Sequence, residues 1–265
     1  MKISEMKILI VGMGYIGKNF SEHAKKYFTV DTTDSREEWK QKNFENYSAV
    51  IFSAGIAHRK QTKKNAQLYF AVNRDLAVAV AEKAKLAKVP QFIYLSSMAV
   101  FGKKEGEISA HTKPNPRHND YYGKSKFDAE NALTNLQNAD FKIAIIRPPM
   151  VYGENCPGKY RQLVKIAKFM PIVPCNKNKR SVIHIDKLSE FLCTVIKNRA
   201  AGNFHPQNEN HVSTSDLITQ IRRENGKTTR TFGAGLFLRL CAAVFPPVKT
   251  AFGTLYYDHE GAQRE

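Results

Sequence analysis

Tyr122 and Lys126 have the residue types and the spacing that proton transfer requires. Residues four apart on a helix lie on the same face, so a helix here would hold the lysine ammonium near the phenol. A nearby cation favours the phenolate and lowers the pKa of the tyrosine from its usual value of ~10. Such a tyrosine can exchange a proton with a sugar hydroxyl while a hydride moves to or from a nicotinamide. The pair alone is a weak signal, because ordinary exposed helices contain the same spacing.

A serine at the end of an apolar run supplies a third group. Ser97 follows the predicted strand Gln91–Ser96, and the carboxyl ends of parallel strands are where such sheets bind ligands. We expect the Ser97 hydroxyl to bond the reacting oxygen and to orient it toward Tyr122. The competing interpretation is that Ser96 and Ser97 only cap the end of the strand.

The run GMGYIG at residues 12–17 is a candidate phosphate-binding loop. Gly12, Gly14 and Gly17 follow a predicted strand and open a predicted helix, which is the context that gives this pattern its meaning. Glycine lets the backbone approach a pyrophosphate, and the helix start at Tyr15 and Ile16 offers amide groups and a positive dipole end. The pattern predicts a bound dinucleotide; the alternative is a tight turn without a ligand.

The residues after the second strand bear on which dinucleotide binds. Asp34 lies at about the distance from the loop where a carboxylate meets the adenosine ribose. It would accept hydrogen bonds from the ribose hydroxyls and repel a 2′-phosphate, which favours NAD. Arg36 could instead hold a 2′-phosphate, so NADP stays the alternative. Asp31 also lies near this strand end, and either aspartate could be only a turn or cap residue.

These groups need a sheet to position them, and the first half of the chain predicts one. Short apolar runs alternate with helical patterns, which indicates an α/β fold with a doubly wound parallel sheet of Rossmann type. The predicted strands are Lys7–Val11, Thr29–Thr33, Ala49–Ser53, Gln91–Ser96 and Lys142–Ile146, and the predicted helices are Ile16–Lys26, Ser35–Phe44, Asn65–Lys88 and Asp120–Asn138.

After residues 147–149 the chain becomes rich in proline and loops, which predicts a smaller C-terminal substrate lobe. We assign residues 1–150 to the NAD(P)-binding domain, with 181–200 returning to it, and residues 151–180 and 201–265 to the lobe. The elements predicted here are a helix at Tyr160–Phe169, a strand at Ser181–Ile185, a helix at Asp186–Lys197, and a helix that a capping box begins at Ser213.

The composition excludes several classes of protein. The 265 residues are 42% hydrophobic and 25% charged, no apolar run approaches the ~18 residues of a membrane span, and no signal peptide is evident. We therefore expect a cytoplasmic protein. The net charge of +17 favours anionic partners, but scattered lysines do not predict specific nucleic-acid binding. The cysteines, residues 156, 175, 193 and 241, are too far apart to predict a disulfide framework or a metal site.

The apolar segment Ala234–Phe245 is predicted to be a helix packed on the substrate lobe. A helix on a membrane surface, and so a peripheral membrane contact, is the less favoured alternative.

The glycine loop, Ser97 and the Tyr122/Lys126 pair together resemble the extended short-chain dehydrogenase/reductases. The likeness is to the NAD-dependent nucleotide-sugar epimerase/dehydratase family, and within it to the UDP-glucose 4-epimerase-like proteins and UDP-N-acetyl-sugar 4-ketoreductases of polysaccharide loci. Further matches are the runs Tyr69–Asn73, Arg147–Gly153 and Arg180–His184, and the resemblance extends from Lys7 to about Asp258.

The resemblance implies an enzyme that works at C4 of a UDP-hexose or UDP-N-acetylhexosamine in surface polysaccharide precursor synthesis. Tyr122 would be the acid–base group, Lys126 would tune it and hold the nicotinamide ribose, and Ser97 would stabilise the C4 oxygen. The further residues implied are Ala54 and Asn73 near the cofactor, Tyr152 at the entrance to the lobe, and Arg180 on the UDP diphosphate, where a guanidinium suits the anion. A homodimer through Asn65–Lys88 and Asp120–Asn138 is also implied.

The chain departs from the family in three places. Val11 stands where the first loop glycine is usual. Met98 and Ala99 replace the Asp-Glu pair of the 4,6-dehydratases, so dehydration is not expected. The chain ends soon after Asp258, so we expect the substrate lobe to be truncated at its C-terminus. Epimerase and 4-ketoreductase both stay open, and the alternative of another class is a non-catalytic dinucleotide-binding sensor or scaffold.

Overall fold

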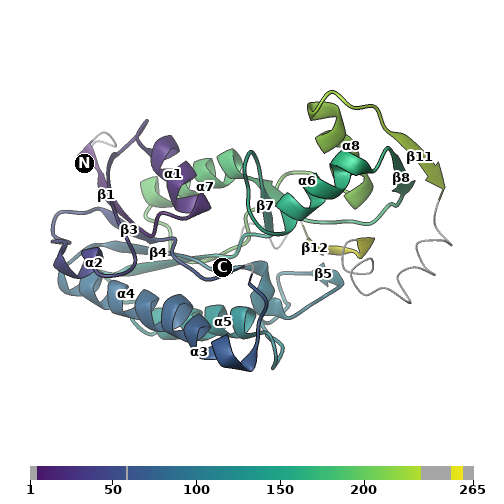
Figure 1. Cartoon of the computed structure of the whole chain (residues 1–265). Helices are drawn as coiled ribbons and strands as arrows, with labels where there is room; N and C mark the ends of the chain where they lie inside the picture. The colour runs from purple at the N-terminus through teal and green to yellow at the C-terminus, as the bar shows by residue number, and fades with distance from the viewer. Residues whose placement is uncertain (1–4, 58, 234–251, 259–265) are drawn as a thin grey trace.

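A parallel sheet of six strands lies at the centre of the computed structural model, which describes residues 5–57, 59–233 and 252–258 (Figure 1). The strand order is β10-β6-β4-β3-β1-β2. These strands are β1 (Lys7–Val11), β2 (Thr29–Thr33), β3 (Ala49–Phe52), β4 (Gln91–Leu95), β6 (Lys142–Ile146) and β10 (Gly202–Phe204). The predicted doubly wound fold is therefore confirmed, and every strand expected in the first half of the chain is present.

Helices cover both faces of the sheet (Figure 1). One face carries α1 (Tyr15–Ala24) and α7 (Ile185–Lys197), and the other carries α3 (Ala66–Phe70), α4 (Leu76–Leu86) and α5 (Tyr121–Thr134). Successive strand residues alternate between the two layers, as the period of a strand requires. In β1, Ile8 and Ile10 pack with α1 and α7, whereas Leu9 and Val11 pack with α4 and α5.

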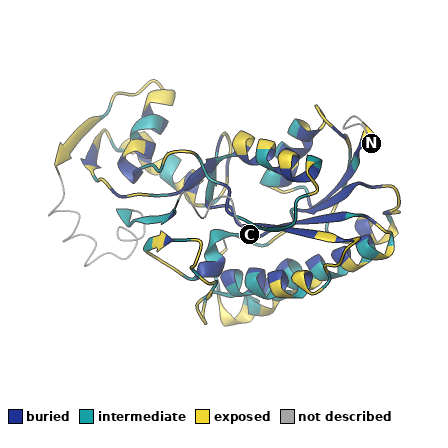
Figure 2. Ribbon diagram, turned by 180° about the vertical axis from the view of Figure 1, so that it is seen from behind, coloured by how far each residue is buried: buried dark blue, intermediate teal, exposed yellow. Residues whose placement is uncertain are grey.

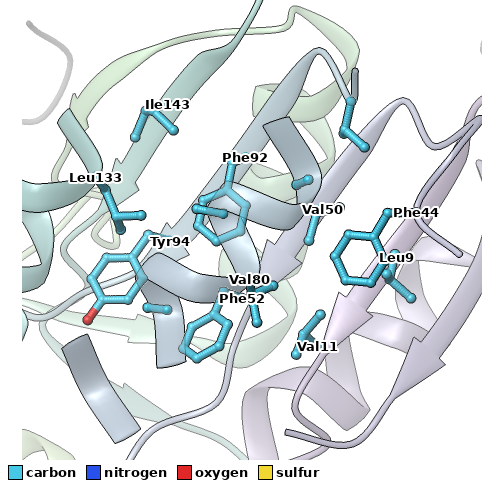
Figure 3. Packing of buried hydrophobic residues seen from close by; sticks show 14 of the residues in the cluster. Leu9, Val11, Phe44, Val50, Phe52, Val80, Phe92, Tyr94, Leu133 and Ile143 are labelled. Atoms are coloured by element: carbon cyan, nitrogen blue, oxygen red, sulfur yellow. The ribbon is translucent and has the colours of Figure 1, made fainter. Parts of the chain in front are cut away.

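The core beneath α4 and α5 holds the start of α5 in place. Figure 3 shows Phe52, Phe92 and Tyr94 of the sheet meeting Val80 of α4 and Leu133 of α5. Leu133 is fully buried in this cluster, as is Ala129 one turn earlier. The C-terminal half of α5 is thus packed on the sheet, and its first turns lie at the carboxyl end of β4, where the Lys126 ammonium bonds the Leu95 carbonyl oxygen.

The single helix predicted over Asn65–Lys88 is wrong in detail. The structure has a 3₁₀ turn at Lys63–Asn65, then α3, a π turn at Ala71–Asp75, and α4. In the widened π turn the carbonyl oxygen of Asn73 accepts a hydrogen bond of 2.6 Å from the buried Tyr94 hydroxyl. Single π turns inside helices often occur at functional sites, and this one places the buried Asn73 side chain against α5.

The second lobe is built around two amphipathic helices. They are α6 (Lys159–Phe169) and α8 (Thr214–Glu224), whose predicted capping box at Ser213 is present. Short parallel strand pairs surround them: β8 (Ile172–Cys175) with β11 (Arg230–Gly233), β5 (Gly106–Ile108) with β12 (Leu255–Tyr257), and β7 (Met150–Tyr152) with β9 (Val182–His184).

Residues 181–200 were predicted to rejoin the NAD(P)-binding domain after the first part of the substrate lobe. In the structure this part of the chain extends further, because β10 pairs with β6 in the main sheet. The division into a cofactor domain and a substrate lobe stays a prediction. The short helix α2 (Glu38–Gln41) lies within the predicted range Ser35–Phe44. The predicted helix Ala234–Phe245 falls outside the described residues.

Among the described residues, none of the helices combines the length and the apolar character needed to cross a membrane. In the same part of the chain, histidines, cysteines and carboxylates form no cluster suited to a metal ion. Cys156, Cys175 and Cys193 are free thiols.

Candidate functional site

The glycine loop lies at the point where the strand order reverses. β1 and β3 are neighbours there, and the loops that leave their carboxyl ends open the crevice in which doubly wound sheets bind ligands. Gly12 has φ +98°, and a Cβ on it would stand 2.6 Å from the Ala54 Cβ. Glycine is therefore required at position 12, and Ala54 lies directly against the loop.

The loop has the form of a pyrophosphate cradle. A Cβ on Gly17 would fall 2.2 Å from the Gly12 carbonyl oxygen, whereas a Cβ on Gly14 would meet no atom within 4 Å. Gly17 thus lets α1 pack closely on the loop, and Gly14 leaves open space for a ligand. The first turn of α1, from Tyr15 and Ile16, has neither a side-chain cap nor an acidic residue. Its amide groups fit the pyrophosphate of a dinucleotide.

The Tyr15 side chain points away from the glycine loop and bonds a different segment of the chain. Its hydroxyl donates to the Glu154 carbonyl oxygen at 3.1 Å. Burial, followed by the neighbouring Cys156, raises the pKa of this phenol. Tyr15 therefore joins the first turn of α1 to the loop after β7, and only its backbone remains for the predicted contact with the cofactor.

Asp34 caps the turn that follows β2. Its Oδ1 accepts hydrogen bonds from the backbone amides of Arg36 at 2.9 Å and Glu38 at 3.2 Å. This is the turn interpretation that the sequence left open, and it uses one of the two carboxylate oxygens. Asp31 lies within β2, where hydrogen bonds from Tyr47 and Lys7 lower its pKa. Asp34 and Arg36 are both exposed, so the choice between NAD and NADP stays open.

Ser97 and Tyr122 meet at the carboxyl end of β4. Ser97 begins the 3₁₀ turn Met98–Phe101, where its side chain accepts from the Ala99 amide at 3.2 Å, and it lies near enough to the Tyr122 phenol to lower the pKa of that group. The start of α5 is fixed by its cap Asp120, which accepts from the Gly123 amide at 3.0 Å. Gln61 accepts from the Tyr122 amide, also at 3.0 Å. The phenol thus has a defined place beside a serine that can bond the same substrate oxygen.

The expected effect of Lys126 on Tyr122 is not found. Burial raises the pKa of Tyr122, and the group that opposes this rise is Ser97 rather than Lys126. The Lys126 ammonium donates to the Leu95 carbonyl oxygen at 2.7 Å and lies 4.6 Å from the centre of the Tyr94 ring. Burial lowers the pKa of Lys126 to about 7, against the opposing charge of Glu130. Burial thus weakens the positive charge that Lys126 can offer to a phenolate.

The buried Lys126 predicts a pH-dependent stability. Between its folded pKa of about 7 and its ordinary value of 10.5 the unfolded chain binds more protons at this group. Its contribution to the free energy of unfolding therefore rises with pH in that window and is constant below it. In urea titrations at about pH 6 and about pH 9, wild type should gain stability relative to K126M. A difference that does not change with pH, or an equal change in the control K124M from the same helix, would contradict this.

Asn73 ties the loop after β3 to α5. Its Oδ1 accepts from the Ile56 amide at 2.8 Å, and its Nδ2 donates to the Ile56 carbonyl oxygen at 3.2 Å and to the Ser125 hydroxyl at 3.0 Å. A Cβ on Gly55 would lie 3.2 Å from Asn73 Oδ1 and 3.3 Å from Lys126 Nζ. Asn73 and Lys126 thus approach the same glycine, close to the predicted cofactor crevice.

Positive side chains gather near the start of α5. Burial lowers the pKa of Lys159, and the charges of Arg180 and Arg117 lower it further, while Asp120 opposes them. Arg180 also donates to the Gly253 carbonyl oxygen at 3.0 Å. The sequence singled out Arg180 alone. Lys159 and Arg117 were missed because they belong to no motif in the sequence.

Tyr152 lies in a different place from the catalytic candidates. Its hydroxyl accepts from Asn208 at 3.0 Å, and its ring meets His184 edge-on with 5.1 Å between ring centres. It lines a cavity of about 790 Å³ between β7, α6 and α8, whose lining includes neither Ser97 nor Tyr122. The structure therefore brings Ser97, Tyr122 and Lys126 together and does not bring Tyr152 to them.

Known proteins share this sequence pattern and fold. A sequence model described as the NAD dependent epimerase/dehydratase family matches residues 6–208. A UDP-glucose 4-epimerase of Vibrio cholerae is 30% identical over 187 residues, which cover 66% of this chain and 56% of that protein. An uncharacterised protein of Sinorhizobium fredii is 28% identical over 131 residues, which cover 48% of this chain and 33% of that protein. The chain thus spans about half, or less, of the length of these curated relatives.

Solved structures with the same fold include epimerases and reductases. A UDP-glucuronic acid 4-epimerase of Bacillus cereus in complex with NAD has a TM-score of 0.72 at 19% identity, covering 97% of this chain and 89% of that one. A dTDP-4-dehydrorhamnose reductase of Clostridium acetobutylicum has a TM-score of 0.71 at 22% identity, covering 86% and 83%. A dTDP-4-dehydrorhamnose reductase of Bacillus anthracis in complex with NADP has a TM-score of 0.71 at 21% identity, covering 89% and 86%. At these identities the likeness shows the fold.

Proposed function

The chain belongs to the NAD dependent epimerase/dehydratase family, and on this premise we propose that it catalyses oxidoreduction at C4 of a UDP-hexose or UDP-N-acetylhexosamine. The reaction is that of a 4-epimerase or of the related 4-ketoreductase. The observation that carries the proposal is the place of the buried Tyr122 phenol beside Ser97, at the carboxyl end of β4 and one helical turn from Lys126. NAD is the cofactor of the family, as predicted, with NADP as its variant.

Tyr122 is the proton donor and acceptor in this proposal. Burial raises its pKa, so the phenol is protonated at neutral pH, and this form can donate a proton to a C4 ketone. In the oxidative direction the base is the deprotonated form, the phenolate that this donation leaves, and it takes the proton from the C4 hydroxyl. Ser97 bonds the C4 oxygen and keeps it in line with the phenol. The nicotinamide, when bound, supplies or accepts the hydride at C4.

The surrounding residues orient the reactants. Lys126 lies close to Gly55, where it can hold the nicotinamide ribose, and the buried Asn73 fixes the backbone of this loop against α5. Arg180, Lys159 and Arg117 interact through their charges near the start of α5, and a diphosphate would relieve their mutual repulsion. Met98 and Ala99 carry no acid or base beside Ser97, which supports oxidoreduction without loss of water.

The test begins with the dinucleotide carried by the purified protein, identified by mass after denaturation. The protein is then incubated with UDP-glucose, UDP-galactose, their N-acetyl forms and the 4-keto sugars, and the products are separated. Near-stoichiometric NAD with interconversion of C4 epimers supports a 4-epimerase, whereas exchangeable cofactor with reduction of a 4-keto sugar supports a ketoreductase. A protein that binds neither dinucleotide, or that binds one and turns over no UDP-sugar, would contradict the proposal. The second of these results would favour the sensor alternative.

Asp34 offers a test of cofactor choice that preserves the fold. In D34N the side-chain oxygen can still cap the amides of Arg36 and Glu38, but the negative charge is lost. If this charge repels a 2′-phosphate, the affinity for NADPH should rise by roughly fivefold or more relative to NADH. Binding titrations with both reduced dinucleotides measure the ratio, and R36Q should change it in the opposite direction. If both variants have the same ratio of NADPH to NADH affinity as wild type, Asp34 and Arg36 do not determine which cofactor binds.

A further inference from the structure

Large apolar side chains gather on the outer face of the second lobe. Phe169 at the end of α6 is 86% exposed, Ile172 of β8 is 53% exposed, and Ile166 of α6 is 51% exposed. Phe232 of β11 is 41% exposed, and the whole strand is coloured as exposed in Figure 2. We call these four residues the apolar patch. The other exposed large apolar residues of the described chain lie apart from one another: Tyr27 in the turn after α1, Leu68 in α3 and Leu86 in α4.

The patch borders an open hollow rather than a covered core. Ile166, Phe169 and Ile172 line this hollow together with Met170, Pro171 and Lys165. Contiguous exposed apolar surface is uncommon on a protein in water and usually marks an interaction site.

Cations frame the patch. Lys165 lines the hollow, and the Lys227 ammonium donates to the Lys168 carbonyl oxygen at 3.1 Å. Arg230 is the register partner of Ile172, and its amide donates to the Pro171 carbonyl oxygen at 2.9 Å. Every charged residue between positions 159 and 180, and between 225 and 257, is a lysine or an arginine. These two segments therefore carry no carboxylate, and Glu224 at the end of α8 lies just before the second of them.

We propose that the apolar patch and its basic border bind the surface of an anionic lipid bilayer. Aromatic and aliphatic side chains beside lysine and arginine are the composition that enters the boundary between headgroups and acyl chains. Each cation near an anionic surface adds attraction, and burial of Phe169, Ile166 and Ile172 removes apolar area from water. The mode is peripheral contact by side chains of α6, β8 and β11.

The charge distribution favours a bilayer over two other partners. A second copy of the chain that docked through the same face would bring two carboxylate-free surfaces together, and their like charges would repel. A nucleic acid would satisfy the cations, but its phosphates cannot cover the aliphatic side chains at the centre of the patch. An anionic bilayer offers headgroups to the lysine and arginine side chains of the border. Just below them it offers acyl chains to the apolar side chains of the patch.

Vesicle sedimentation with full-length protein measures this binding. The vesicles are phosphatidylcholine alone or phosphatidylcholine with about a third phosphatidylglycerol. Wild type should sediment with the anionic vesicles. The double variant F169S/I172S should bind at least tenfold more weakly, and K165Q/R230Q should also lose affinity, by about fivefold per cation removed. The control L86S removes an equally exposed side chain from α4 and should bind like wild type.

A tryptophan probe shows whether the patch itself enters the lipid. The single native tryptophan, Trp39, is buried, so F169W adds a surface indole whose emission should shift to the blue with anionic vesicles. The inference is overturned if the anionic vesicles leave wild type in the supernatant, or if F169S/I172S, folded by circular dichroism, sediments like wild type. It is also overturned if the F169W emission is already blue-shifted in buffer and does not respond to vesicles, because another part of the chain or a second copy then covers the patch.

Discussion

Replacement of Tyr122 by phenylalanine should lower turnover by roughly 100- to 10,000-fold, the contribution of a positioned acid–base group. The variant loses one oxygen, and this is the atom that exchanges a proton with the C4 oxygen in the proposed reaction. The main-chain bond from Tyr122 to Gln61 and the cap at Asp120 do not involve the phenol. The dinucleotide should therefore bind with nearly unchanged affinity. Steady-state rates with the UDP-sugar accepted by wild type, together with a dinucleotide titration, measure both quantities.

Tyr121 provides a matched control for this variant. It has the same side chain, lies one residue earlier on α5, and has an uncharged serine four residues later. Y121F should retain activity close to that of wild type. A Y122F enzyme with full turnover would remove Tyr122 from the chemistry. Equal losses in the two variants would indicate a disturbed helix rather than a missing acid. Because a sensor needs no proton donor, a selective loss in Y122F also separates the catalytic proposal from the sensor alternative.

The sequence predicted elements whose signals are local. β1 and β4 appear as continuous apolar runs because helices bury both faces of the sheet. The glycine loop was identifiable because Gly12 and Gly17 answer geometric needs that the structure displays, such as the close approach of Gly17 to Gly12. The capping box at Ser213 lies within four residues of chain and was found for the same reason.

Other features arise only from tertiary contacts. The π turn at Ala71–Asp75 follows from the partners of Asn73, which are distant in sequence, so a helical pattern over residues 65–88 could not reveal it. The low pKa of Lys126 is a consequence of its burial, which a four-residue spacing does not report. Lys159 is far from Arg117 and Arg180 in sequence, and their charges act on it only in the folded chain. The sequence therefore indicated which chemical groups are present, while their protonation depends on the packing around them.

A buried ion pair joins the catalytic helix to the rest of the molecule. Glu130 lies two turns after Tyr122 on α5 and is 2% exposed, and Arg147 after β6 is 8% exposed. Arg147 donates to both carboxylate oxygens of Glu130, from Nε at 3.1 Å and from an Nη at 2.9 Å. The Ser96 hydroxyl also donates to this carboxylate, and the Tyr257 hydroxyl donates to the Arg147 carbonyl oxygen at 2.9 Å. The pair thus connects α5, the end of β4 and the C-terminal strand β12.

Removal of the charge of Glu130 should be strongly destabilising. E130Q leaves the Arg147 guanidinium buried without its counter-ion, and the loss of one partner of a buried pair costs about 3–5 kcal/mol. The charge of Glu130 also raises the pKa of Lys126, so E130Q should make Lys126 more neutral at pH 7. Urea unfolding measures the first effect. The second effect is measured by comparing E130Q with E130Q/K126M at several pH values. The pH window in which E130Q gains stability over E130Q/K126M should lie lower than the window in which wild type gains stability over K126M.

Two further variants separate the pair from a general intolerance of this position. E82Q changes an exposed glutamate on α4 and should alter the free energy of unfolding by less than about 0.5 kcal/mol. The double variant E130M/R147M replaces both charges with apolar side chains, and it should be less destabilised than the sum of its single variants. An E130Q protein within about 1 kcal/mol of wild type would mean that water reaches the pair and screens Arg147. The ion pair would then not be what fixes α5, and with it Tyr122, against the sheet.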